Sequence, residues 1–233
     1  DGKGQLRLPK QPSAEEIGQA WNEFDGGRVV IEECITLESE MSVLVARTPE
    51  GKIVNYDPVE NIHRNHILDL SIVPARIPQD YLNLACETAS EIADCLNYVG
   101  LLAVEFFVSS DGRLIVNEIA PRPHNSGHHT INACHTSQFE QQVRAVSGFP
   151  LGSTKLLSPV IMMNLLGDLW QDSLTPPDWK NILGIKGISL HLYGKRKARP
   201  GRKMGHVTIM GDLTEDCIQK ARSIRKELEL PTF

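Results

Sequence analysis

The sequence has no long apolar run, no paired-cysteine motif and no surplus of positive charge. No apolar stretch reaches the roughly 20 residues that a bilayer-spanning helix needs, so we expect no membrane partner. The 24 basic and 29 acidic residues give a net charge of −5, which offers no electrostatic basis for binding nucleic acid. The scattered cysteines are typical of reduced thiols in a cytoplasmic protein: Cys34, Cys86, Cys95, Cys134 and Cys217.

Hydrophobic periodicity and turn residues predict an α+β protein, and 233 residues are enough for a sizeable core. Amphipathic patterns predict helices over residues 13–24, 78–96, 137–147 and 214–228, and Ser13 with Glu16 predicts a capping box at the start of the first. In the helix over 78–96 we expect the inward positions to be Leu82, Ala85, Ala89, Ile92, Ala93 and Leu96. Apolar and β-branched runs predict strands over residues 28–35, 41–47, 52–58, 101–108, 114–119, 160–166, 187–193 and 205–210.

Two polar stretches are predicted to be irregular. Residues 60–65 lack a clear apolar period, and we expect them to form a polar connection. Pro121 and Pro123 follow the strand over 114–119, and they predict a loop there and not a helix.

The strands over 101–108 and 114–119 flank Asp111-Gly112, which is a strong hairpin signal. A two-residue loop pairs Ser110 with Arg113, and counting outward then pairs Glu105 with Glu118. The two carboxylates fall opposite each other on one face, about 5 Å apart at Cβ, and Asn117 points to the other face. Such a pair destabilises a sheet unless a positive charge lies between the carboxylates.

A hard divalent cation with oxygen ligands suits this pair, and Mg²⁺ carrying nucleotide phosphates fits best. Glu105 and Glu118 are therefore the predicted metal ligands. The alternative is an edge hairpin with both glutamates in water. We rank it lower because the neighbouring residues are too apolar for a solvated ribbon.

The loop after the second strand collects polar side chains, as binding loops do: Arg122, His124, Asn125, Ser126, His128 and His129. Together with His135, its histidines leave open a zinc hydrolase as a different class of enzyme. Adjacent His128 and His129 suit one tetrahedral site poorly, so we rank the zinc hydrolase low.

Two further stretches are rich in glycine and basic residues. The segment 194–203 suits a small phosphorylated ligand, through Lys195, Arg199, Arg202 and Lys203. The chain starts with Asp1, Gly2, Lys3, Gly4 and Gln5, which could cradle phosphate through backbone N–H groups. This start is similar to the second half of a glycine-rich loop, so we expect the chain to be a fragment of a longer protein.

The run from Asn117 to His128 resembles the signature loop of the 5-(carboxyamino)imidazole ribonucleotide synthases, a family of ATP-grasp ligases in purine synthesis. Two more runs, within 136–152 and 199–206, resemble the same family. The resemblance implies an ATP-grasp fold with an antiparallel sheet and helices, plus a small β-rich C-terminal subdomain. It implies three parts: residues 1–35 of the lid, 36–154 around the metal and nucleotide, and 155–233.

The resemblance also implies an ATP site. Residues 1–5 would close over the phosphates, with Asp1 near the bicarbonate-derived group. The backbone of Glu32, Glu33, Cys34 and Ile35 would hold adenine, Glu40 would meet the ribose and His63 would lie near the nucleotide. Asn117 and Glu118 would complete the nucleotide and metal contacts.

For the second substrate, the resemblance implies that Arg122, His124, Asn125 and the basic segment bind aminoimidazole ribonucleotide. We expect catalysis to involve Asp1, Arg122 and Lys203, with ATP and Mg²⁺ as cofactors and bicarbonate as the carboxyl source. A homodimer is expected from the family, and no activity is expected from residues 1–233 alone.

Two further functions stay open beside the synthase and the zinc hydrolase. The first is an ATP-grasp ligase with another acceptor, such as a formate-dependent transformylase or a biotin-carboxylase-like enzyme. Ala120 argues mildly for the synthase, because many relatives place Asn there as an extra metal ligand. The second is a non-catalytic nucleotide-binding module.

Overall fold

The computed structural model describes residues 6–24 and 27–233. The chain forms two compact units, Asp1–Thr36 and Leu37–Phe233. In the first, helix α1 (Ala14–Glu23) begins after Ser13 with the predicted capping box. The backbone N–H of Ser13 donates to Glu16 Oε2 at 2.7 Å, and the N–H of Glu16 donates to Ser13 Oγ at 3.2 Å. The predicted helix and its N-cap are confirmed.

The predicted buried strand over residues 28–35 is wrong. These residues form no regular element, and Val30 and Ile31 are 84% and 88% exposed. A strand is stabilised by the ladder of backbone hydrogen bonds that it forms with a neighbouring strand. No described strand forms such a ladder with residues 28–35. The apolar run alone was not enough to make it a strand.

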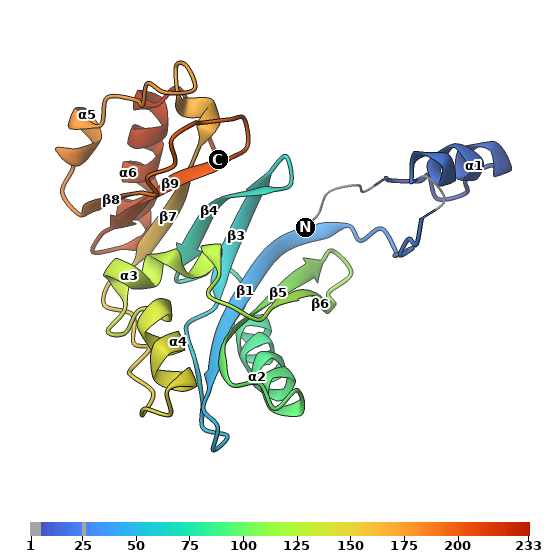
Figure 1. The fold of residues 1–233 in the computed structure, drawn as a ribbon, viewed down its shortest axis with the longest axis horizontal. Coiled ribbons are helices and arrows are strands. Elements are labelled where there is room, and N and C mark those ends of the chain that lie inside the picture. Colours follow the sequence, from blue (N-terminus) through green and yellow to red (C-terminus); the bar gives the residue numbers. More distant parts are fainter. Residues whose placement is uncertain (1–5, 25–26) are drawn as a thin grey trace. The chain divides into compact units, whose positions relative to one another are not determined.

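The second unit is built on one antiparallel sheet of nine strands, in the order β6-β5-β1-β3-β4-β7-β9-β8, with β2 beside β1 (Figure 1). The strands are β1 (Leu37–Arg47), β2 (Ile53–Asn55), β3 (Val59–Arg64), β4 (Ile67–Val73), β5 (Gly100–Ser109), β6 (Leu114–Ala120), β7 (Val160–Leu166), β8 (Ile188–Leu192) and β9 (Lys203–Met210). The helices are α2 (Gln79–Cys95), η1 (Asn125–His129), α3 (Thr130–Ala133), α4 (Gln138–Val146), η2 (Gly167–Leu169), α5 (Lys180–Leu183) and α6 (Thr214–Glu227).

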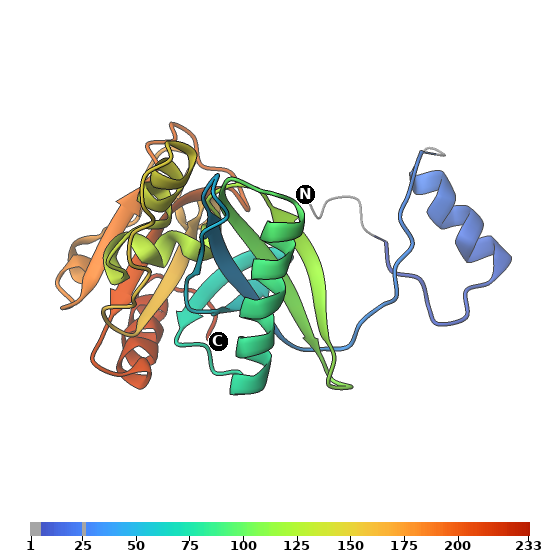
Figure 2. The same cartoon turned by 90° about the horizontal axis from the view of Figure 1, so that it is seen from below.

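Successive side chains of β1 point to opposite faces of the sheet, and both faces are buried. Met41, Val43 and Val45 belong to the core that α2 covers, and Leu44 and Ala46 belong to the core on the other face. Figures 1 and 2 show α2 against β1 and β5, with α3 and α4 on the opposite side. Helix α2 buries three small residues, Ala85, Ala89 and Ala93, whereas Leu96, which we expected to face inward, is 59% exposed.

Two predicted irregular segments are regular instead. Residues 60–64 belong to β3, which pairs with both β1 and β4. Its Asn61 is buried and forms hydrogen bonds with Ser42 of β1 and Ser71 of β4. After Pro123, η1 and α3 replace the predicted loop. Prolines prevent helix only at and just before their own positions, and His124 then caps η1 by accepting the N–H of Ser126.

The C-terminal strands join the same sheet through the β4–β7 ladder, and α6 packs on β7 and β9. The predicted strands over 160–166, 187–193 and 205–210 and the helix over 214–228 are confirmed. The expected division at residues 154 and 155 stays a prediction. Across the described residues, no helix is long and apolar enough to cross a membrane.

Candidate active site

The β5–β6 hairpin places Glu105 and Glu118 as direct cross-strand partners, as predicted. The predicted turn is wrong, because Ser109 N–H donates to the carbonyl of Arg113 at 3.0 Å and three residues form the loop. Gly112 takes φ +85°, a conformation that glycine adopts without strain. A register shift next to Glu105 compensates for the extra loop residue. The carboxylates therefore meet because two one-residue offsets cancel.

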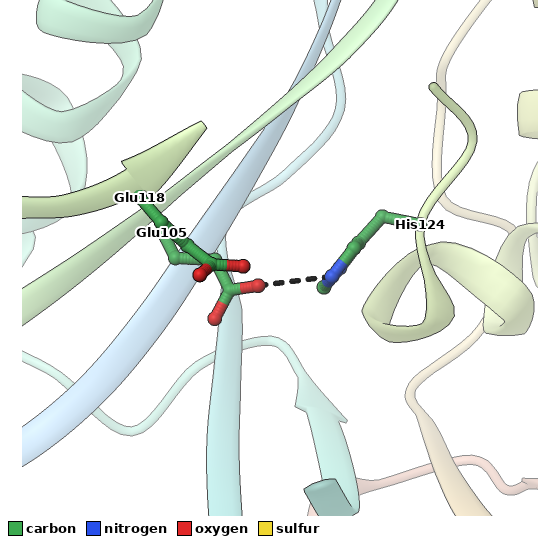
Figure 3. Close-up of side chains that lie close together, drawn as sticks. All are labelled: Glu105, Glu118 and His124. Carbon is green, nitrogen blue, oxygen red and sulfur yellow. Dashed lines mark ion pairs between the residues drawn. The ribbon is translucent and has the colours of Figure 1, made fainter. Parts of the chain in front are cut away.

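The two carboxylates differ in burial. The Glu105 side chain is 13% exposed, whereas Glu118 is exposed on the edge strand β6. Val116 and Ile119 are each 40% exposed, so the argument that the neighbours are too apolar for water holds for Glu105 and is wrong for Glu118. Figure 3 shows both carboxylates directed toward His124. We call Glu105, Glu118 and His124 the carboxylate edge.

His124 fixes the ionisation of Glu105. Its Nε2 lies 2.9 Å from Glu105 Oε1. Burial opposes ionisation of Glu105, but the hydrogen bond from His124 and the nearby positive groups, including Lys203, outweigh it and lower the pKa of Glu105. Burial lowers the pKa of Lys203, although Glu105 partly opposes this effect. The basic segment thus lies within electrostatic reach of the carboxylate edge.

The donor atoms of the carboxylate edge suit a hard cation. One ligand atom from each of Glu105, Glu118 and His124 lies within 4.8 Å of the others, and the described residues contain no second such group. Two carboxylates provide the oxygen ligands that Mg²⁺ prefers. The histidines from His124 to His135 do not converge on one point in the described structure, so the zinc hydrolase lacks its site.

The loop that carries His124 is held by Gln138 at the start of α4. The Gln138 side chain accepts the backbone N–H of His124 at 2.8 Å and donates to its carbonyl at 2.7 Å. It also lies 2.9 Å from His128 Nδ1. A Cβ atom at Gly127 would lie 2.7 Å from Gln138 Oε1, so only glycine permits this close approach. The His124 backbone is thus tied to a helix that packs on β5.

The residues expected at the nucleotide fall into four groups. Glu40 Oε2 and His63 Nδ1 lie 2.9 Å apart on neighbouring strands, so the structure brings this pair together. Asn117 is exposed at the register shift of β6. Glu32, Glu33, Cys34 and Ile35 belong to the N-terminal unit and their role stays a prediction. Asp1, Gly2, Lys3, Gly4 and Gln5 lie outside the described residues.

The residues expected at the ribonucleotide also differ in their surroundings. Lys203 begins β9, and Lys195 Nζ donates to its carbonyl. Arg202 donates to the carbonyl of Lys197 at 2.7 Å, and Arg199 and Arg122 are exposed. Asn125 exchanges two hydrogen bonds with Asn164 of β7, of 3.0 and 2.7 Å, so its amide joins η1 to the sheet.

A second group of titratable residues lies beside this loop. We call His128, His191 and His206 the histidine cluster. The ring centroids of His128 and His206 lie 5.0 Å apart with the rings tilted, and those of His191 and His206 lie 4.5 Å apart with the rings stacked. Burial lowers the pKa of His128 to about 4 and that of His206 to about 3. His206 Nδ1 lies 2.9 Å from the Tyr193 hydroxyl, and its Nε2 is buried without a partner among the described residues. These rings form a packed group in which burial lowers the pKa of every member and so disfavours the protonated form.

Sequence reasoning missed the residues behind His124. Its Nδ1 lies 2.9 Å from Ser126 Oγ, which is in turn bonded to Ser42 of β1. Ser42 interrupts the apolar strand over 41–47, and Ser71 interrupts the apolar strand β4 in the same way. A polar residue inside an apolar strand was the available signal, since buried hydroxyls are almost always hydrogen-bonded.

Comparison with known proteins identifies both halves of the chain. The profile of the ATP-grasp domain matches residues 1–139, and that of the phosphoribosylaminoimidazole carboxylase C-terminal domain matches residues 160–220. N5-carboxyaminoimidazole ribonucleotide synthase of Bacillus subtilis is 45% identical over 220 residues, which cover 94% of this chain and 56% of the relative. The chain thus spans little more than half the length of this relative.

Solved structures that resemble this chain carry the same enzyme name as the sequence relatives. The enzyme of Thermus thermophilus superimposes with a TM-score of 0.86 at 36% identity, covering 95% of this chain and 59% of that one. The synthase of Aspergillus clavatus, solved with ADP and 5-aminoimidazole ribonucleotide, gives a TM-score of 0.83 at 29% identity, with 94% and 58% covered. The predicted fold class and resemblance are confirmed, and the chain belongs to the ATP-grasp family; the relatives that it resembles here are N5-carboxyaminoimidazole ribonucleotide synthases.

Proposed function

We propose that the native full-length protein carboxylates 5-aminoimidazole ribonucleotide in purine synthesis, with ATP and bicarbonate as co-substrates. The observation that carries the proposal is the carboxylate edge, in which two opposed carboxylates lie on an ATP-grasp sheet beside His124. The names of the relatives in both comparisons support the choice of acceptor. The protein would be an ADP-forming carbon–nitrogen ligase.

Magnesium fits the carboxylate edge on its donor chemistry. Glu105 is the buried member and its pKa is lowered, which keeps it ionised for a cation at neutral pH. Glu118 provides the second carboxylate from the open edge of the sheet. When bound there, Mg²⁺ would neutralise charge on the ATP phosphates.

The reaction we propose has two displacements. An oxygen of bicarbonate attacks the γ-phosphorus of ATP, the bond to the β-phosphate oxygen breaks, and ADP leaves with carboxyphosphate formed. The exocyclic amine of the ribonucleotide then attacks the carboxyl carbon, phosphate leaves, and the amine loses a proton. Arg122 and Lys203 would bind the anionic reactants, with Asp1 near the bicarbonate-derived group.

The remaining assignments concern binding. His124 and Asn125 would bind the ribonucleotide, and Lys195, Arg199 and Arg202 would face its phosphate. Glu40 and His63, which lie 2.9 Å apart, would meet the nucleotide together. A homodimer follows only from the resemblance, and sedimentation of the native protein would test it.

The test is ADP release by the native full-length protein with Mg-ATP, omitting the ribonucleotide and bicarbonate in turn. We expect release that requires the ribonucleotide and a labile carboxylated product that requires bicarbonate. Release that depends on another acceptor, such as formate, would keep the ligase class and overturn the substrate. No hydrolysis of ATP under any condition would favour the nucleotide-binding module.

A further inference from the structure

Four buried polar residues lie one behind another beneath His124. They are Ser126 of η1, Ser42 of β1, Asn61 of β3 and Ser71 of β4, exposed by 0%, 0%, 5% and 0%. We call them the polar chain. The Ser71 hydroxyl donates to Asn61 Oδ1 at 3.1 Å, Asn61 Nδ2 donates to Ser42 Oγ at 3.0 Å, and Ser42 Oγ donates to Ser126 Oγ at 2.8 Å.

The register of the sheet produces this alignment. Asn61 and Ser71 are direct partners on β3 and β4, and Ser42 and Glu105 are direct partners on β1 and β5. The side chains of direct partners point to the same face of a sheet. The polar chain therefore lies on the face that carries Glu105. It therefore connects strands in the middle of the sheet to the carboxylate edge.

The two ends of the hydrogen-bonded series fix its direction. An ionised Glu105 carboxylate only accepts, so His124 Nε2, 2.9 Å away, carries a hydrogen. The backbone N–H of Ser126 only donates, and it points to His124 Nδ1 at 3.4 Å, so Nδ1 accepts. The Ser126 hydroxyl, 2.9 Å from Nδ1, then donates to it as well.

The Asn61 amide keeps the series pointing the same way. Its N–H group can only donate to Ser42, so the Ser42 hydroxyl is left to donate to Ser126. With the amide in this orientation, a reversed series would make Ser42 donate toward that same N–H, and one buried hydrogen would lose its acceptor. Every donor therefore points from Ser71 toward Glu105.

We propose that Ser71, Asn61, Ser42 and Ser126 are positioning residues that hold His124 in its Nε2–H tautomer, directed at Glu105. The consequence is that His124 takes part in the carboxylate edge as a hydrogen-bond donor and not as a third metal ligand. A cation there then meets oxygen ligands, which suit Mg²⁺, and no imidazole nitrogen, which suits zinc.

This inference rests on the proposed metal-binding role of the carboxylate edge, but its test needs neither metal nor turnover. The full-length protein is labelled with ¹⁵N-histidine, and long-range ¹H–¹⁵N correlation reports which ring nitrogen of His124 carries hydrogen. A His124→Gln spectrum assigns the signals. We expect a protonated Nε2 and an unprotonated Nδ1 in the wild-type protein.

Asn61→Asp tests the direction of the series. A carboxylate at this position accepts from both Ser71 and Ser42, so the hydroxyls turn and Ser126 becomes an acceptor for His124. We expect Nδ1 to become protonated. The control is Asn55→Asp, because Asn55 of β2 donates to Cys86 and Ser90 away from this series, and the His124 signals should not change.

Ser126→Ala is the second variant, in case Asn61→Asp does not fold. It removes the hydroxyl that donates to Nδ1, and we expect the ratio of the Nε2–H to the Nδ1–H form to fall several-fold. A protonated Nδ1 in the wild-type protein overturns the proposal, as do folded Asn61→Asp and Ser126→Ala proteins with wild-type His124 signals. Failure of the carboxylation assay alone would leave the tautomer result standing.

Discussion

The carboxylate edge and the histidine cluster are two groups of titratable side chains in the same unit, and they handle charge in opposite ways. In the carboxylate edge, the bond from His124 and nearby cationic groups lower the pKa of Glu105 despite its burial. In the histidine cluster, burial lowers the pKa of His206 to about 3, and its Nε2 has no partner among the described residues. One group is arranged to carry charge and the other to exclude it.

The difference shows why several histidines in one sequence are weak grounds for a metal site. In the carboxylate edge, ligand atoms from three residues converge within 4.8 Å. In the histidine cluster, His191 and His206 stack with a 14° angle between their rings, and the rings pack against each other. Convergent lone pairs together with nearby charge distinguish a cation site from packed imidazoles.

The largest effect we expect is on turnover. Glu105→Gln keeps the size of the side chain but removes its charge, so the cation site loses a ligand worth several kcal/mol in the transition state. That corresponds to about a thousand-fold lower kcat for ADP release by the full-length protein. Circular dichroism serves as the folding control, and wild-type turnover by the folded variant would refute the assignment.

The histidine cluster should dominate the response to acid. Because the pKa of His206 falls from about 6.5 in the unfolded chain to about 3 in the folded one, the unfolded state binds more protons between these values. The free energy of unfolding therefore drops as pH falls below 6.5, by roughly 2 kcal/mol for this residue at pH 5. Urea unfolding at pH 7 and pH 5 measures this difference in the free energy of unfolding.

His206→Phe keeps an aromatic ring without the titration, and it should make the unfolding free energy less dependent on pH. The matched control is His135→Phe, because His135 is exposed and the same substitution there should leave the wild-type slope. An equal slope in wild-type and His206→Phe proteins would show that folding does not lower the pKa of His206.

A third experiment compares a partnered buried polar group with an unpartnered one. Asn61→Ala leaves the hydroxyls of Ser42 and Ser71 without their partner and should cost about 1 to 2 kcal/mol of unfolding free energy. Thr208→Val removes a buried hydroxyl that has no partner among the described residues, so it should cost close to nothing. Equal losses in the two variants would mean that the polar chain adds no stability of its own.

The sequence was sufficient for features that depend on local pattern. The capping box at Ser13, the helix after Pro78 and the hairpin around Asp111 were predictable because short-range spacing determines each of them. The pairing of Glu105 with Glu118 was predicted correctly from an incorrect turn. A bulge is a tertiary adjustment that the period of a strand does not reveal.

Long-range polar contacts explain the failures. Residues 60–65 looked irregular because Ile62 is the one apolar residue among them, and only the contacts to Ser42 and Ser71 make the Asn61 side chain compatible with a buried strand. The polar chain joins residues up to 84 positions apart, so no window of sequence contains it. The prediction for residues 28–35 failed for the reverse reason, since their pattern suits a strand but no described strand forms a ladder with them.

The smallest effect that we expect is a change in stability at Glu118, where the role in binding and the role in stability have opposite signs. Opposed carboxylates destabilise a sheet, so Glu118→Gln should raise the free energy of unfolding by a few tenths of a kcal/mol, up to about 1. With Mg-ATP, the wild-type full-length protein should unfold at a higher temperature than Glu118→Gln, because a ligand stabilises more the protein that binds it more tightly. If Glu118→Gln stays more stable than wild type at saturating Mg-ATP, the opposed carboxylates do not bind a cation. The repulsion between them would then have no binding energy to offset it.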